Sequence, residues 1–235
     1  SNGRVEFGIG RGFVEFDYER LHIPRDDSNE RMREQLEVIL KAWSGQAFEH
    51  KGRGYQYDNL EGWPTPEQRP HPPIWVSCTR TPSSFEWAGQ KGFNVLTVAY
   101  HSVENLAVNN RIYREAWDKA GHPKGKWNLA AHYHCVLAEN KQEAREIARN
   151  AWRRYIESTT HTNERMGRRA TGVVAENRKK ATDELLDTDR MVAELRQIAC
   201  TPDECVDLLA KAQDKMGFTQ CDCTFFFGGI NYEQA

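Results

Sequence analysis

The chain has 235 residues, enough for one large domain or two small ones with a buried core. Its 32 basic and 34 acidic side chains give a formal net charge of -2, which argues against a nucleic-acid-binding protein and against a polybasic membrane-surface protein. No apolar run approaches the roughly 20 residues of a membrane span, and no signal peptide opens the sequence. The six cysteines are too few and too scattered for a disulfide scaffold, so we expect reduced thiols in a cytoplasmic protein.

The first part of the chain alternates between strand and helix patterns. Alternating apolar residues predict a strand over 4–10, and helically spaced apolar residues predict a helix over 31–43. Residues 46–72 are rich in Gly, Pro and Tyr, and we expect a long excursion there that holds a hairpin. The patterns then predict strands over 74–78, 94–99 and 129–138 and helices over 84–90, 103–120 and 141–157.

Periodicity is lost over residues 158–190, which are polar and rich in Arg and Lys. A segment of this length in a compact domain is either disordered or a functional lid, and we expect a mobile lid insertion here. Regular structure returns at 191–198, and a helix then starts at Thr201-Pro202, with proline at its first position. A hydrophobic strand over 221–227 follows and ends at Gly228-Gly229.

Alternating strands and helices are typical of a parallel α/β architecture. We count about five βα units, which would complete an open sheet but would leave a (β/α)₈ barrel about three units short. The sequence starts at Ser1 almost within a strand, and its last four residues resemble the first turn of a helix. We therefore expect residues 1–235 to be a single domain truncated at both ends, with the fold of a partial barrel.

The segment Gly8-Ile9-Gly10-Arg11-Gly12-Phe13 follows the first predicted strand. A dinucleotide-binding fingerprint needs a third glycine that opens a helix, whereas this chain has Phe13 there and no helix is predicted at that point. The segment would instead place Arg11 at the carboxyl edge of the sheet, where barrel active sites lie. The guanidinium suits a phosphate, although a solvent-facing arginine at a tight strand exit is the simpler alternative.

A second polar segment, from Thr79 to Ser84, follows another strand and enters a helix. Hydroxyl groups and the free N–H groups of a helix N-terminus form an anion site, whereas an ordinary helix cap is the alternative. This segment and Arg11 lie at the same edge of the sheet. Together they indicate a phosphorylated cofactor.

Three further groups of residues are candidates for a chemical role. His132 and His134 share one face of a strand, but no third ligand is obvious, so a metal site is not expected. Cys221 and Cys223 have the same geometry, and we expect buried core thiols. His101 follows a strand at the active edge and could exchange a proton near neutral pH, or it could simply cap the next helix.

Several segments together resemble the bacterial luciferase-like flavin-dependent monooxygenases. They are the run from Asn2 to Gly12, the Pro-rich run from Pro64 to Trp75, the segment from Ser83 to Gly89 with Gly92, the helix start at Thr201–Cys205, and the Phe-rich strand with its two glycines. The resemblance covers essentially the whole chain in order. It implies a TIM barrel, of which this chain would hold about the fourth to eighth βα units.

The resemblance also implies a flavin site. Arg11 would contact the phosphate of reduced FMN, with Phe13 beside it. Hydroxyl groups would complete the cradle (Thr81 and Ser84, with Ser83 as a neighbour), and Tyr100 would lie against the flavin ring. The segment 158–190 would be the lid that shields the flavin from water. The family's catalytic histidine would lie in strands absent here, so His101 is the remaining candidate catalytic residue.

The implied function is an FMN-dependent monooxygenase that uses O₂ on a small organic substrate, with reduced FMN supplied by a flavin reductase. A homodimer is implied by the resemblance alone. Light emission is not implied, because Gly10 stands where luciferases have a reactive cysteine. Two alternatives remain: an F420-dependent dehydrogenase or reductase on the same barrel, and a non-catalytic flavin-binding protein.

Overall fold

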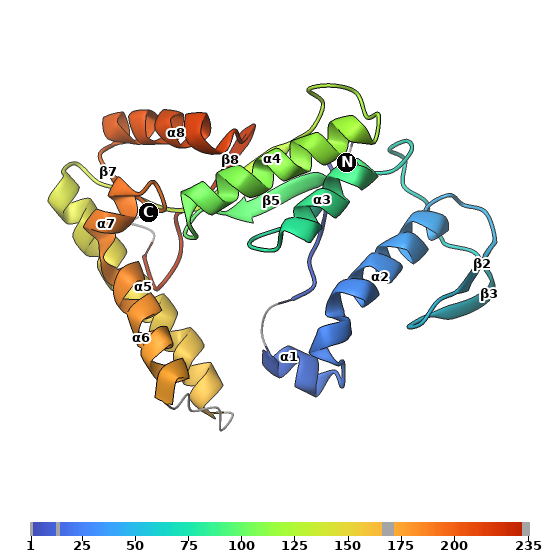
Figure 1. Ribbon diagram of the computed structural model, residues 1–235, viewed down its shortest axis with the longest axis horizontal. Coiled ribbons are helices and arrows are strands. Elements are labelled where there is room, and N and C mark those ends of the chain that lie inside the picture. The colour runs from blue at the N-terminus through green and yellow to red at the C-terminus, as the bar shows by residue number, and fades with distance from the viewer. Residues whose placement is uncertain (1, 13–14, 166–171, 232–235) are drawn as a thin grey trace. The chain divides into compact units, whose positions relative to one another are not determined.

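The computed structural model describes residues 2–12, 15–165 and 172–231, in two compact units, Ser1–Ser77 and Cys78–Ala235 (Figure 1). Each unit is described by itself. In the first unit the elements, in chain order, are β1 (Phe7–Ile9), α1 (Glu15–Arg20), the 3₁₀ helix η1 (Arg25–Asp27), α2 (Ser28–Ala42), β2 (Phe48–Lys51), β3 (Gln56–Leu60) and β4 (Ile74–Ser77).

The first unit combines a parallel strand pair with a helix and a hairpin. β1 pairs in parallel with β4, with Phe7 opposite Ile74, and β2 pairs antiparallel with β3, which confirms the expected hairpin. Helix α2 starts three residues earlier than predicted. It is fixed to β2 by Glu34, whose carboxylate lies 3.1 Å from the ring of buried His50. The backbone N–H groups of Gly54 and Tyr55 also donate to this carboxylate.

The second unit holds the longer part of the chain. Its elements are α3 (Pro82–Lys91), β5 (Asn94–Val98), α4 (Val103–Lys119), β6 (Leu129–Leu137), α5 (Lys141–Arg165), α6 (Gly172–Leu186), α7 (Thr188–Ala193), β7 (Ile198–Cys200), α8 (Pro202–Met216) and β8 (Gln220–Thr224). Among the described residues, none of the helices combines the length and apolar character needed to cross a membrane.

Strand β6 is the centre of the second unit. It pairs in parallel with β5 and β8 along its first half and with β7 along its last three residues. The register places Val98, the last residue of β5, opposite His132. On the other side His132 lies opposite Asp222, and His134 lies opposite Thr224, the last residue of β8. The carboxyl ends of β5 and β8 therefore meet along the middle of β6.

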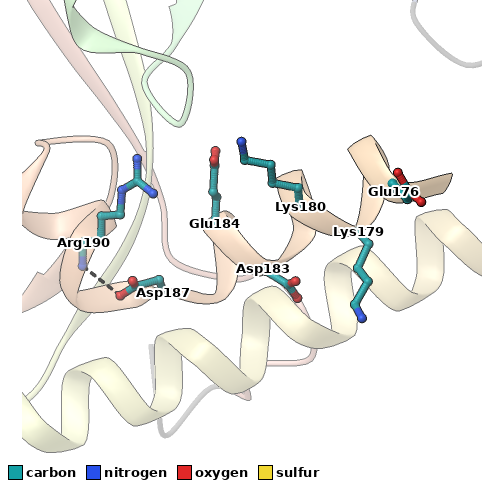
Figure 2. Close-up of a pocket in the computed structure, with 7 residues that line it drawn as sticks. All are labelled: Glu176, Lys179, Lys180, Asp183, Glu184, Asp187 and Arg190. Atoms are coloured by element: carbon teal, nitrogen blue, oxygen red, sulfur yellow. Dashed lines mark hydrogen bonds between the residues drawn. The ribbon is translucent and has the colours of Figure 1, made fainter. Parts of the chain in front are cut away.

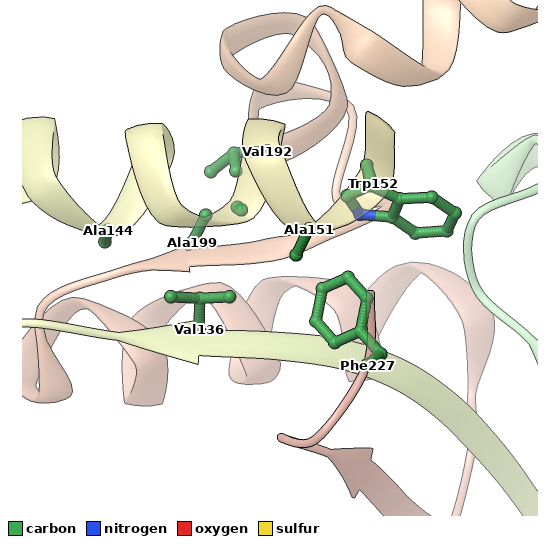
Figure 3. Close-up of a cluster of buried hydrophobic side chains, with 8 residues drawn as sticks. Val136, Ala144, Ala151, Trp152, Val192, Ala199 and Phe227 are labelled. Carbon is green, nitrogen blue, oxygen red and sulfur yellow. The ribbon is translucent and has the colours of Figure 1, made fainter. Parts of the chain in front are cut away.

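The main apolar cluster of this unit lies where α5 crosses the end of β6 (Figure 3). Val136 of β6 faces small residues of α5, and Trp152 and Phe227 lie at one end of the cluster. The rings of Trp152 and Phe227 also contact the ring of His134. Because Ala144, Ala148 and Ala151 have short side chains, α5 can approach the strand closely. The cluster thus fixes α5 over the carboxyl half of the strand.

The helix ends follow local sequence signals. Thr201 and Glu204 form a reciprocal capping box at the start of α8, as the sequence predicts, and Gly217 ends this helix with a φ of +69°. Gly92 ends α3 in the same way. The predicted strand over 221–227 is shorter than expected, because β8 ends at Thr224 and the following phenylalanines turn away from the sheet.

Residues 158–165, 172–186 and 188–190 are helical, although the sequence shows no periodicity there, and the role of this segment as a mobile lid stays a prediction. Helix α5 continues to Arg165, and α6 and α7 follow. α5 contacts both α6 and α7, and Figure 1 shows α6 alongside α5. An ion pair between Arg145 of α5 and Asp189 of α7 links these helices.

Candidate functional site

The start of α3 is an exposed helix N-terminus with hydroxyl groups around it. Thr81 is its N-cap residue and Pro82 occupies the first turn, but no side chain caps the helix by a hydrogen bond. Thr81 and Ser83 are exposed and Ser84 is half-buried, and the Ser84 N–H donates to the Thr81 carbonyl at 2.9 Å. The helix dipole and these hydroxyl groups form a suitable environment for an anion.

In the first unit, Arg11 lies in an extended stretch just after β1 and is exposed. The hydroxyl of buried Tyr18 contacts the carbonyl oxygens of Arg11 and Gly12, the latter at 3.0 Å. Tyr18 belongs to α1, a short helix that the sequence did not predict. It fixes the backbone of the loop while leaving the guanidinium free to reach a ligand. Phe13 lies outside the described residues.

Tyr100 follows β5, and its backbone is held in place by an arginine. The Arg196 guanidinium donates to the Tyr100 carbonyl from two nitrogens, at 2.8 and 3.0 Å, and also pairs with Glu194 at 3.0 Å. The Tyr100 ring packs edge-on against Trp152, with the ring centres 5.7 Å apart. The ring of His101 lies 4.5 Å from that of Tyr100.

The two rings after β5 are both uncharged at neutral pH. Burial raises the pKa of Tyr100, and neighbouring Tyr155 raises it further. Burial and, to a smaller extent, the positive charges of Arg80 and Arg196 together lower the pKa of His101 to about 4. His101 is therefore a neutral imidazole at physiological pH, which does not match the expected proton exchange near neutrality. It can still donate or accept a hydrogen bond.

His132 and His134 lie on one face of β6, as predicted, and the structure adds a partner that the sequence analysis missed. His132 Nδ1 lies 2.7 Å from a carboxylate oxygen of Asp222, its register partner on β8. On the other side of the ring, Nε2 lies 3.4 Å from the Thr224 hydroxyl. The His132 side chain is 20% exposed and that of Asp222 is 59% exposed.

His134 lies beside this pair in an aromatic environment. Its ring centre is 5.4 Å from that of His132 and 4.7 Å from those of Trp152 and Phe227. Burial and, to a smaller extent, the nearby His132 together lower the pKa of His134 to about 4. Its Nδ1 atom is buried and has no hydrogen-bond partner in the described part of the chain. Aromatic rings thus connect His132, through His134 and Tyr100, with His101.

The opposite face of the same strands carries thiols. Cys221 is exposed and Cys223 half-buried, which corrects the prediction of buried core thiols, and their sulfur atoms lie 3.5 Å apart. None of the six cysteines, all of which lie in the described part of the chain, forms a disulfide bond. In the described part of the chain, no group of three or more His, Cys, Asp or Glu residues is placed to hold a metal ion.

A cavity of about 450 Å³ lies along α6 and the start of α7 (Figure 2). The side chains that line it are all charged: Glu176, Lys179, Lys180, Asp183, Glu184, Asp187 and Arg190. Figure 2 shows Lys180 and Glu184 directed to one side of the helix and Lys179 and Asp183 to the other. An open groove of mixed charge does not suit an apolar ring system, so we do not assign the flavin to it.

A family model described as luciferase-like monooxygenase matches residues 1–220 of the chain. The chain belongs to this family. Its identification and the predicted fold class are confirmed: the described strands and helices form part of a parallel α/β barrel. The crystal structure of the monooxygenase RslO1 from Streptomyces bottropensis matches the whole chain with a TM-score of 0.79 and 26% identity, over 65% of that protein.

Curated relatives agree on the family but differ in what their names state. The chain is 34% identical, over 155 residues, to the oxygenase component of a flavin-dependent trigonelline monooxygenase from Acinetobacter baylyi; the match covers 63% of this chain and 41% of that protein. It is 23% identical to the alkanal monooxygenase alpha chain of Photorhabdus luminescens, over 97% of this chain and 65% of that protein. The chain thus spans from two fifths to two thirds of these relatives.

Solved structures similar to this chain include proteins that bind different cofactors, FMN in one and F420 in another. The oxygenating constituent of 3,6-diketocamphane monooxygenase from Pseudomonas putida, in complex with FMN, has a TM-score of 0.70 and 20% identity and covers 95% of this chain and 65% of that protein. An F420-dependent secondary alcohol dehydrogenase has a TM-score of 0.67 and 18% identity, over 94% of this chain and 64% of that protein. At these identities the likenesses show the fold alone.

Proposed function

We propose that the protein is the oxygenase component of a two-component, FMN-dependent monooxygenase that acts on a small organic substrate. The observation that carries the proposal is the exposed, uncapped N-terminus of α3, whose hydroxyl groups follow Arg80 in the chain, and Arg80 in turn lies near enough to Tyr100 for its charge to offset part of the rise that burial causes in the pKa of that phenol. Phosphate-binding and ring-binding features thus occur together in a chain of the luciferase-like family.

The residues present fit FMN. The phosphate would be held by the N–H groups at the start of α3, by the hydroxyls of Thr81, Ser83 and Ser84, and by Arg11. Tyr100 would lie against the flavin ring, since Arg196 fixes its backbone. Phe13 would flank the phosphate. When bound, reduced FMN supplies the two electrons with which one atom of O₂ enters the substrate and the other leaves as water.

The protein's own contribution would be binding, exclusion of water and proton handling. The rings of His101 and His134 are neutral, so the groups beside the Tyr100 ring are aromatic, while the positive charges of Arg80 and Arg196 lie near them and suit an anionic ligand with a flat ring. The segment 158–190 is the proposed lid. A flavin reductase would supply reduced FMN, and the relative from Acinetobacter, named as an oxygenase component, supports this division of labour. A homodimer remains a proposal from the family resemblance.

The cradle predicts that FMN binds more tightly than riboflavin, which lacks the phosphate. Replacing Arg11 by alanine removes a charge-assisted hydrogen bond, commonly worth about 1.5–3 kcal/mol, so FMN should bind about 10- to 100-fold more weakly. Riboflavin binding should change less than about threefold. Both dissociation constants are measured by fluorescence quenching, on protein made from the complete gene.

The matched control is Arg111→Ala, which removes an exposed arginine of α4. It should leave both dissociation constants unchanged. Equal losses of FMN and riboflavin affinity in Arg11→Ala would contradict the cradle. Tight binding of F420 in place of FMN would support the second candidate, an F420-dependent dehydrogenase or reductase. Two solved structures of similar fold are F420-dependent enzymes.

A further inference from the structure

The face of β6 that carries the two histidines is covered along only part of its length. Helix α5 packs over Val136, and Trp152 and Phe227 cover His134 (Figure 3). His132, two residues earlier on the same face, lies beyond this cover and stays partly exposed. The strand thus presents a buried imidazole and an accessible one side by side, at the level where β5 ends.

The accessible imidazole has a defined orientation. Because Asp222 accepts from Nδ1 at 2.7 Å, the proton of the neutral ring lies on Nδ1 and the lone pair on Nε2. Nε2 is directed toward the Thr224 hydroxyl, 3.4 Å away. A carboxylate that fixes the tautomer of a histidine and stabilises its protonated form is the arrangement by which enzymes prepare an imidazole for proton transfer.

The neighbouring imidazole points to a ligand. His134 is only 9% exposed, yet its buried Nδ1 has no hydrogen-bond partner in the described residues. A buried polar atom without a partner lowers the stability of the fold by about 1–3 kcal/mol unless a ligand or a water molecule forms a hydrogen bond with it. The atom lies between the accessible His132 and the ring of Tyr100, which is proposed to lie against the flavin.

The alternative is that His132 and Asp222 only stabilise the fold. An ion pair with one partner 59% exposed contributes about 0–1 kcal/mol, which is too little to explain a pair in register on two strands. The covered part of the face holds apolar Val136 as well as His134, whereas His132 and Asp222 place two ionisable groups on the part that the cluster leaves uncovered. This distribution favours a site over a packing role.

We propose that His132 transfers protons at its Nε2 atom during the oxygenation reaction, that Asp222 is its positioning residue, and that His134 accepts or donates a hydrogen bond to the substrate. The inference rests on the proposed function. In the net reaction, substrate, O₂ and reduced FMN give oxygenated substrate, water and oxidised FMN. The O–O bond breaks, one oxygen atom bonds to the substrate, and the other becomes water with the two hydrogens that reduced FMN loses.

In this scheme His132 would give a proton to the oxygen atom that becomes water and would take one back from the two hydrogens that reduced FMN loses, so it is unchanged over a cycle. Thr224 would pass the proton between Nε2 and its surroundings. General acid–base groups typically contribute 10²- to 10⁴-fold in rate. Loss of such a group should therefore slow the last stage of the reaction, the return to oxidised FMN, and leave the first reaction with oxygen unchanged.

The test uses protein made from the complete gene, loaded with reduced FMN and mixed with oxygen. In His132→Gln, the fast phase of the absorbance change should keep its rate, and the final return to oxidised FMN should slow by 10²- to 10⁴-fold. Asp222→Asn should slow it by about 10- to 100-fold, as second-sphere carboxylates commonly do. FMN dissociation constants should change less than threefold. Imidazole added to His132→Ala should restore the rate of the return to oxidised FMN.

A second readout needs no flavin. Nitrogen-15 NMR of the flavin-free protein should show His132 as the Nδ1–H tautomer, and Asp222→Asn should abolish that preference. Asp207→Asn, which changes an exposed carboxylate of α8, is the matched control and should alter neither readout. An unchanged slow phase in His132→Gln, or an Nε2–H tautomer, would overturn the inference. Absence of the slow phase in the unaltered protein would instead contradict the proposed function.

Discussion

At the scale of single residues, burial rather than residue type decides which histidine can exchange a proton. His101 and His134 are both driven to the neutral form, with pKa values of about 4, because burial disfavours their charged forms and nearby cationic groups oppose protonation. His132 sits on the same sheet face but has a carboxylate partner and an accessible ring. The residue that the sequence singled out, His101, and the residue that the geometry favours are thus different ones.

The buried state of His134 makes stability depend on pH. Its ordinary pKa of 6.5 applies to the unfolded chain, and burial lowers the value to about 4 in the fold. Between these values the unfolded chain binds the proton more readily, so the fold loses stability as pH falls from about 6.5 to 4. The contribution from His134 is fully present above pH 6.5 and amounts to at most about 3 kcal/mol.

Replacing His134 by glutamine should remove this contribution. We expect the free energy of unfolding to fall less between pH 7 and pH 4 in His134→Gln than in the unaltered protein. Urea denaturation at several pH values measures the difference, and carboxylates that titrate in the same range cancel in the comparison. Parallel curves for the two proteins would show that His134 is protonated in the fold.

At the scale of elements, α3 and α4 cross at a glycine, and this crossing sets the position of the proposed phosphate site. A Cβ atom at Gly89 would lie 2.3 Å from the Tyr113 carbonyl oxygen and 2.9 Å from the Cβ of Ala116. The contact involves backbone atoms of α4, so it cannot be relieved by a side-chain rotation. Gly89 therefore lets the two helices approach closely.

Gly89→Ala should destabilise the protein despite the better helix propensity of alanine. Overpacking typically costs about 1–3 kcal/mol, against about 1 kcal/mol gained from propensity, so we expect a net loss of up to about 2 kcal/mol. Chemical denaturation measures this loss. Gly8→Ala is the matched control, because nothing lies within 4 Å of a Cβ placed there. Equal stability of the two variants would refute the close crossing.

The sequence predicted most elements but not their pairings. Helical spacing and caps located α4 and α8 to within a few residues, because these signals are local. Helix α6 was missed, since its apolar residues lie in pairs at its two ends and form no stripe. The His132–Asp222 pair was missed because it depends on the register of two strands 90 residues apart, which no local pattern encodes.

At the scale of the whole molecule, family membership and local geometry support each other. The family model covers residues 1–220, and the second unit places a hydroxyl-lined helix start, a fixed aromatic ring and an oriented histidine at the carboxyl edge of parallel strands. In open and closed α/β folds this edge carries the active site. Arg11 belongs to the first unit, and its part in the cradle stays a prediction.

Relatives whose names state different substrates share this fold. The relatives named above act, by their names, on trigonelline and on alkanals. The aromatic neighbourhood of His134 and Tyr100 favours a flat ligand with a hydrogen-bonding group. A panel of N-heteroaromatic acids and aldehydes would compare these classes directly.

The most direct test of the central claim, an oxygenase that uses reduced FMN, is rapid mixing of the FMN-loaded, reduced protein with oxygen while the absorbance is followed. The proposed function predicts two phases, with a species between them that is neither reduced nor oxidised FMN and that outlasts the reoxidation of free reduced FMN. A single phase as fast as that of free reduced FMN would contradict the claim.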